Sequence, residues 1–145
     1  MSDTALFRRL AKAFALGDTE QAKRLDAEIP DGEREAYNVY VTAFLFGAVG
    51  HRFEDDHSLD AIKKFAAEMS DEYRNAPVPV RVLAVEGLIR AVFGEDNLLD
   101  EISPEDQLRL PIPIIRKIVA QSPHMRERLD DYLTDAATLA TQWTS

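Results

Sequence analysis

Cysteine is absent from this chain of 145 residues, so disulfides, thiolate metal sites and cysteine nucleophiles are excluded. The sequence also lacks a hydrophobic run of the roughly 18 residues that a membrane-spanning helix needs. The longest such run, residues 39–50, is shorter and contains Thr42. The first residues, MSDTALFRRLAKAF, do not have the charged-then-apolar order of a signal peptide. We therefore expect a cytoplasmic protein without a membrane partner.

Positive charge is scarce as well. Lysine and arginine number 17 against 26 aspartates and glutamates, which gives a formal net charge of −9. Nucleic acids and anionic membranes bind clustered basic residues, so this balance disfavours both as partners. The modest basic patch of the N-terminal region lacks interleaved aromatic residues; it consists of Arg8, Arg9, Lys12, Lys23 and Arg24. No nucleic-acid partner is expected, whereas a basic protein partner is compatible with the charge.

The hydrophobic pattern predicts an all-α protein forming a single domain over residues 1–145. Hydrophobic residues make up 46% of the chain, which is ordinary for a globular protein, and they recur at helical spacing. Two segments are apolar almost all round, residues 35–53 and residues 80–93, and we expect them to form the buried centre. Within the first, Gly47 and Gly50 predict the close approach of a neighbouring backbone, because glycine is unfavourable inside a helix. Gly50 could instead end the helix, in which case it carries no such cost. No sustained alternation of apolar and polar residues indicates a strand.

Capping and proline signals mark the other elements. A first helix capped by Ser2 or Asp3 should end at Gly17, and a second should run from Asp18 to Pro30. Further helices should begin after Ser58, Ser103 and Ser122, the last of them reaching about Trp143. Residues 110–113 are expected to be extended and residues 114–121 to form a short helix. The total is six to eight helices packed as antiparallel helical hairpins, in a bundle or a short helical-repeat-like array.

Three loop segments look alike: residues 17–22, 56–61 and 94–97, with a spacing of roughly 38–39 residues that lies within the range of helical-hairpin repeats. The first, GDTEQA, locally resembles the loop and second-helix start of tetratricopeptide hairpins, and the resemblance implies stacked helical hairpins. The glycine and tyrosine that this family carries in its first helix have no counterpart here. A generic bundle of antiparallel helix pairs explains the same pattern and is the preferred interpretation.

The segment HRFEDDH carries the densest group of metal-ligating side chains. If the central helix continues past Gly50, His51, Glu54 and Asp55 share one face at spacings i, i+3 and i+4, and His57 follows closely. Imidazole and carboxylates together can bind a divalent metal ion. The alternative is a solvated loop whose acids precede the next helix. No HExxH motif supplies further ligands elsewhere.

Glu86 is unusual because it lies in an otherwise apolar helix. One interpretation makes it the polar anchor of a ligand pocket between the two apolar helices. The preferred alternative is a salt bridge to Arg90 or Arg81, since buried charges are normally paired.

The last helix presents an apolar stripe that contains Tyr132 and ends at Trp143, the only tryptophan. The stripe could complete the core, which is the preferred interpretation, or form a dimer or partner surface.

These features favour a non-catalytic helical protein–protein interaction or adaptor protein, with a protein partner or a homodimer as the assembly. No nucleophile elbow or glycine-rich phosphate loop indicates an enzyme, and no cofactor is expected. The alternative is a metal- or small-molecule-binding protein that uses the His51–His57 segment or a pocket near Glu86.

Overall fold

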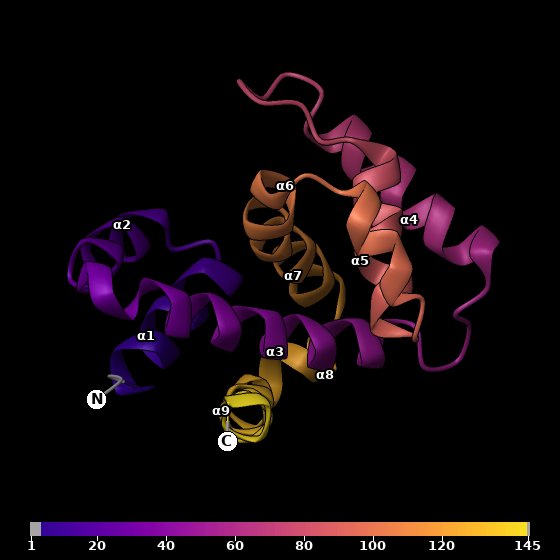
Figure 1. Ribbon diagram of the computed structural model, residues 1–145. Helices are drawn as coiled ribbons and strands as arrows, with labels where there is room; N and C mark the ends of the chain where they lie inside the picture. The colour runs from indigo at the N-terminus through magenta and orange to yellow at the C-terminus, as the bar shows by residue number, and fades with distance from the viewer. Residues whose placement is uncertain (1–3, 145) are drawn as a thin grey trace.

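The computed structural model describes residues 4–144, and within that range it is helical and contains no strand (Figure 1). The expected cap at Ser2 or Asp3 lies outside the described residues. The elements are α1 (Thr4–Ala15), α2 (Thr19–Ala27), η1 (Asp31–Glu33), α3 (Arg34–Arg52), α4 (Leu59–Glu72), α5 (Val82–Val92), η2 (Asp96–Glu101), α6 (Pro104–Arg109), α7 (Pro111–Gln121), α8 (Pro123–Glu127) and α9 (Leu129–Thr144), where η denotes a 3-10 helix.

The described residues thus form nine α-helices in one compact chain, more than the six to eight expected. One reason is that the last expected helix is divided near Arg128 into α8 and α9. The prediction of an extended segment at residues 110–113 is wrong, because α7 begins at Pro111. Pro111 and Pro113 occupy its first turn, where a proline removes no hydrogen bond that the helix would otherwise make.

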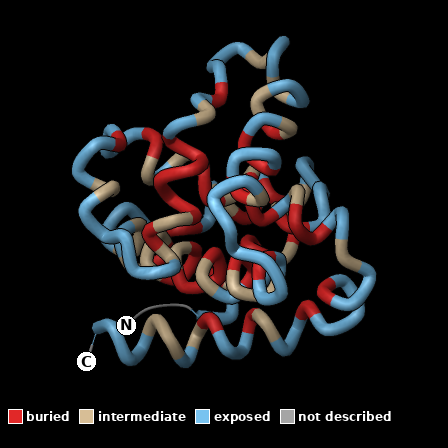
Figure 2. Tube along the Cα trace, turned by 90° about the vertical axis from the view of Figure 1, so that its right-hand side faces the viewer, coloured by how far each residue is buried: buried red, intermediate tan, exposed pale blue. Residues whose placement is uncertain are grey.

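Helix α3 runs through the middle of the molecule. It packs most extensively on α9 and α7, both far away in sequence, and also contacts α5 (Figure 1). Its Tyr40, Phe44 and Val49 are almost completely buried. The tube in Figure 2 accordingly shows buried residues concentrated in the interior, while α9, at the lower edge, alternates between buried and exposed turns. Within residues 4–144, no helix has the length and apolar character needed to cross a membrane, α3 included.

The two glycines of α3 do not serve a close approach of backbones. A Cβ added at Gly50 would have no neighbouring heavy atom within 4 Å, apart from the local helix backbone, among the described residues. A Cβ at Gly47 would meet only the Tyr132 ring, at an ordinary contact distance of 3.7 Å. The expectation of a tightly apposed backbone is therefore wrong at both positions.

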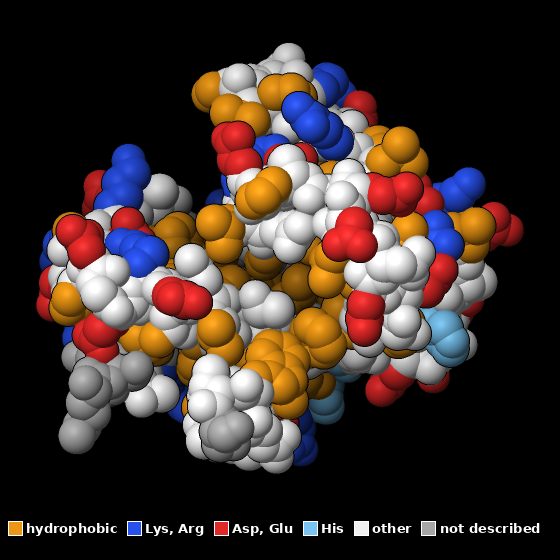
Figure 3. Space-filling model, viewed as in Figure 1, with side chains coloured by type: hydrophobic (Ala, Val, Ile, Leu, Met, Phe, Trp, Pro, Cys, Tyr) orange, Lys and Arg blue, Asp and Glu red, His pale blue; other side chains and the backbone are white. Residues whose placement is uncertain are grey.

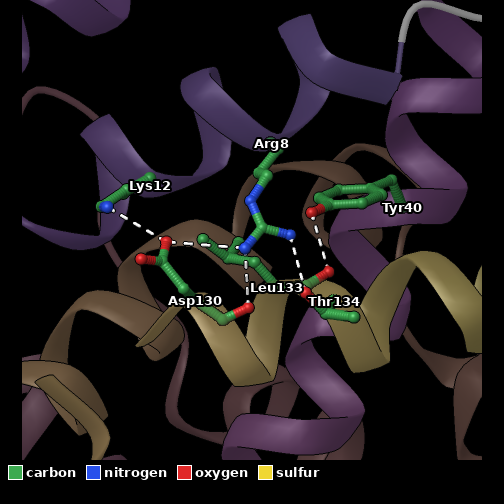
Figure 4. A network of polar contacts seen from close by, with 6 residues as sticks. All are labelled: Arg8, Lys12, Tyr40, Asp130, Leu133 and Thr134. Atoms are coloured by element: carbon green, nitrogen blue, oxygen red, sulfur yellow. Dashed lines mark hydrogen bonds and ion pairs between the residues drawn. The ribbon is translucent and has the colours of Figure 1, made fainter. Parts of the chain in front are cut away.

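Polar contacts join the C-terminal helix to the start of the chain (Figure 4). From α1, Arg8 donates hydrogen bonds to the Thr134 hydroxyl at 2.9 Å and the Asp130 carbonyl at 2.8 Å. Lys12 reaches the Asp130 carboxylate at 3.1 Å. Two residues of the expected basic patch are thus engaged within the fold.

Candidate binding site

A cavity of about 650 Å³ lies between the first two turns of α5, the end of η2 and the start of α6. Its volume is within the range of roughly 300–1,000 Å³ typical of ligand pockets. The cavity opens to solvent, because its lining includes the exposed side chains of Leu83 and Glu101. The lining also includes two buried carboxylates, those of Glu86 and Asp106.

Helix α5 forms one wall of the cavity with the helix face that carries Leu83, Glu86 and Gly87. It begins after the proline-containing segment that ends at Pro79, and Leu83, Glu86 and Gly87 recur on one side at spacings of three and four. Gly87 allows η2 to lie close. A Cβ there would be 2.8 Å from Cδ1 of Ile102, closer than two such carbon atoms can approach. The apolar part of the lining is therefore shaped by the contact between Gly87 and Ile102.

The opposite wall is fixed by two hydrogen-bonded side chains. The Gln107 amide donates to the carbonyls of Leu99 at 2.9 Å and Ile102 at 3.0 Å, which ties η2 to α6. The Ser103 hydroxyl caps α6 by accepting from the backbone N–H of Asp106 at 3.1 Å. Both walls are thus held by interactions that do not depend on an occupant of the cavity.

Glu86 is only 6% exposed, yet its carboxylate has no hydrogen bond or ion pair with any residue of the described range. The preferred expectation of a salt bridge to Arg90 or Arg81 is wrong. Arg90 instead binds Glu95 through two hydrogen bonds of 2.8 and 2.7 Å. This hydrogen bonding to Glu95 raises the pKa of Arg90, and the negative charge of Glu86 adds to the rise at longer range.

Asp106 is 5% exposed, but it has partners. Its Oδ1 accepts from Arg109 at 2.7 Å, and Nη1 of Arg81 lies 3.9 Å from its Oδ2. The same Arg109 donates to the Pro79 carbonyl at 3.2 Å, which joins α6 to the segment before α5. The basic side chains around the cavity therefore have acidic partners of their own, and Glu86 is the buried carboxylate left without one.

The two histidine side chains of the His51–His57 segment do not converge on a common point. Nε2 of His51 lies 2.9 Å from the Ser122 hydroxyl, and its ring stacks on His124 with centroids 5.2 Å apart. His57 stacks on Phe93 instead, at 4.9 Å. Figure 3 likewise shows histidines in separate places on the surface. Among residues 4–144, no group of three or more histidine, aspartate or glutamate side chains is arranged to hold a metal ion.

Of the carboxylates in this segment, Glu54 and Asp55 are exposed. Asp56 accepts a hydrogen bond from the backbone N–H of Ser58, just before α4. Hydrogen bonding to Ser58 lowers the pKa of Asp56. This arrangement matches the alternative of a solvated loop preceding a helix.

Tyr132 and Trp143 have different surroundings. Tyr132 is half-buried and packs edge-on against His51, with centroids 5.7 Å apart. Trp143 is 43% exposed and packs edge-on against Phe46 of α3 at 5.0 Å. A small hollow of about 110 Å³, lined by Phe46 and apolar residues of α5, η2 and α7, lies beside this part of α3, and Figure 3 shows hydrophobic side chains around a hollow on this face.

Sequence reasoning missed several residues of the cavity. Asp106 reads in sequence as an ordinary acid in the first turn of a helix, and Leu83 as one more apolar residue of α5. The helix start at Ser103 was visible, but its position opposite Glu86 depends on packing. Only Glu86 itself carried a signal, as a charge within an apolar helix.

The described residues therefore form an all-helical protein with a partly apolar surface cavity that is lined by two buried acidic residues, Glu86 and Asp106. Comparisons with protein-family models, curated proteins and solved structures find no match to this chain.

Proposed function

We propose that this chain is a non-catalytic interaction protein that binds a protein partner across the face containing the α5–η2–α6 cavity. The observation that carries the proposal is Leu83, which is 79% exposed at the mouth of the cavity while Glu86, one turn further on, is buried in it. An exposed large apolar side chain beside a concave, partly apolar site is typical of an interaction surface.

Other exposed apolar residues support this face. Val78 precedes α5 and Leu108 lies on α6, and both are exposed. The hydrogen bond from Arg109 to Pro79 joins these two segments. Neither exposed apolar side chain lines the cavity, but each lies within three residues of one that does, Arg81 or Asp106. The polar groups of the lining suit binding rather than covalent chemistry, since the Ser103 hydroxyl is occupied as a helix cap.

The second candidate is a small-molecule-binding protein that uses the same cavity. It is favoured by the cavity volume of about 650 Å³ and by the buried acid. We expect the protein to meet its protein partner or small-molecule ligand in the cytoplasm, because the chain is acidic and contains no cysteine.

Site-specific photo-crosslinking tests the proposal. A photoreactive phenylalanine analogue replaces Leu83 in one protein and Leu16, which is 52% exposed and belongs to another surface, in the control. In an extract of the cells that make the protein, we expect one discrete crosslinked partner from position 83 and not from position 16. Unlabelled wild-type protein should compete this crosslink away.

The Leu83→Asp variant should fail to compete. Position 83 is the second residue of α5, where an acid is favourable to the helix dipole, so the substitution leaves the fold intact. Equal crosslinking from positions 16 and 83, or full competition by Leu83→Asp, would contradict the proposed interaction face.

A further inference from the structure

We infer that the cavity accepts a lysine or arginine side chain from a basic segment of the partner, with Glu86 as the acid that binds the cationic group. This inference rests on the proposed function and adds the chemistry of the partner. It begins from Glu86, a side chain more than nine-tenths buried that lines the cavity and has no hydrogen-bonding or ion-pairing partner in residues 4–144.

The Glu86 oxygens are not among the fully buried, unpaired polar atoms of the described residues, so solvent reaches this carboxylate through the open cavity. A cation can reach it by the same route and pair with it where the surrounding side chains keep most water away. The protein's own arginines do not do so. Arg90 is held by both oxygens of Glu95, and Arg109 is held by Asp106. Arg81, whose side chain is largely exposed, is directed toward Asp106 at 3.9 Å. A cation supplied from outside is therefore the group that Glu86 is arranged to bind.

The rest of the lining suits the stem of such a side chain. Lysine and arginine carry an apolar stem below the charged group and bury it along apolar surface. In the cavity, Leu83, Ile102 and Leu98 supply apolar contacts, and Ile102 packs into the space left by the absent Cβ of Gly87. The charged group of a lysine or arginine would lie next to the Glu86 carboxylate, and its apolar stem would lie along these apolar residues.

A protein side chain fits this site better than a free amine. The exposed Leu83 at the mouth offers contact to the residues flanking the inserted side chain, which a small amine does not have. The formal charge of −9 also favours the approach of a basic segment over long range.

The test is an NMR titration of ¹⁵N-labelled protein with three probes: acetyl-Leu-Lys-Leu-amide, the same peptide with norleucine in place of lysine, and butylammonium chloride. The readout is the dissociation constant from the amide signals of Gly87 and Ile102. We expect the lysine peptide to bind at least about tenfold more tightly than the norleucine peptide, since a hydrogen bond to a charged group is lost. It should also bind more tightly than butylammonium.

Variants at matched positions localise the effect. Glu86→Gln keeps the shape of the side chain and removes its charge, and it should weaken the lysine peptide by at least about tenfold. Glu20→Gln makes the same change on an exposed residue of α2, away from the cavity, and should bind like the wild type. Unchanged binding by Glu86→Gln would overturn the inference, and its ¹⁵N spectrum shows whether it is folded.

The remaining outcomes separate the inference from the proposed function. If both peptides bind equally at the cavity, cation recognition is overturned while the interaction face stands. If butylammonium binds as tightly as the lysine peptide, the site takes a free amine and the partner side chain is overturned. If position 83 yields no crosslink but the lysine peptide depends on Glu86, the proposed function fails while recognition of the cationic side chain stands.

Discussion

The hydroxyl of Tyr40 donates a hydrogen bond of 3.0 Å to the backbone carbonyl of Leu133, 93 positions later in the chain (Figure 4). This buried contact joins the central helix α3 to α9. One turn before it, the hydroxyl of Tyr37 is also buried but has no hydrogen-bonding partner among the described residues. Both rings pack against Phe7, with centroids 5.6 Å away for Tyr37 and 6.2 Å away for Tyr40. The two tyrosines therefore form a matched pair that differs in one hydrogen bond.

Tyr40→Phe should destabilise the protein by about 1 kcal/mol, because it removes one buried hydrogen bond while the ring stays in place. Urea unfolding should show a lower midpoint with an unchanged slope. A midpoint equal to that of the wild type would show that the contact with Leu133 adds nothing to stability.

Tyr37→Phe should have the opposite sign and stabilise the protein by about 1 kcal/mol, since it removes a buried polar group that lacks a partner. The same urea experiment measures it. A loss of stability as large as that of Tyr40→Phe would refute the distinction drawn between the two hydroxyls.

Alkaline pH should weaken the fold through the same two residues. Burial raises the pKa of Tyr40 to about 12, from an ordinary value of 10.0, and burial likewise raises the pKa of Tyr37. The folded state then holds these protons more tightly than the unfolded state does. Their contribution is therefore complete below pH 10 and declines as the pH rises from about 10 toward 12.

The measurement is the urea midpoint between pH 8 and pH 11. The double variant Tyr37→Phe/Tyr40→Phe should lose less stability over the alkaline part of this range than the wild type. Parallel curves for the two proteins would assign the alkaline decline to other groups.

Gly50→Ala should stabilise the protein by about 1 kcal/mol, because alanine is the better helix former and the added methyl group meets no tertiary neighbour within 4 Å. Gly47→Ala is the matched comparison, because it makes the same gain in helix propensity in the same helix but brings its new Cβ to 3.7 Å from the Tyr132 ring. Thermal unfolding of both variants gives the difference. A lower midpoint for Gly50→Ala would mean that the position is more crowded than the structure shows.

Glu86→Met should raise the free energy of unfolding by about 0.5–1 kcal/mol, since it places an apolar side chain of similar length at a largely buried position whose carboxylate has no protein partner. The same variant should lose binding of the lysine peptide. A gain in stability together with a loss of binding would identify Glu86 as a residue kept for recognition. Destabilisation would instead show that the acid contributes to the fold.

The sequence by itself determined the elements that depend on near neighbours. The Asp18 and Ser58 caps begin α2 and α4, and both side chains accept the expected backbone hydrogen bond, from Gln21 and Ala61. Prolines at positions 104 and 123 begin α6 and α8. Capping and proline geometry act within about one turn, so a pattern of adjacent residues is sufficient to predict them.

Tertiary structure decided which charges pair and where a cavity forms. The spacing of Glu86 and Arg90 permitted an ion pair, but Arg90 binds Glu95 because Gly94, with a φ of +103°, turns the chain back at the end of α5. Likewise, His51 meets His124 rather than His57, since α3 packs beside α8 and α9. Glu86, Ile102 and Asp106 share a cavity only because α5, η2 and α6 pack together, and such contacts depend on the shape of the whole core rather than on local spacing.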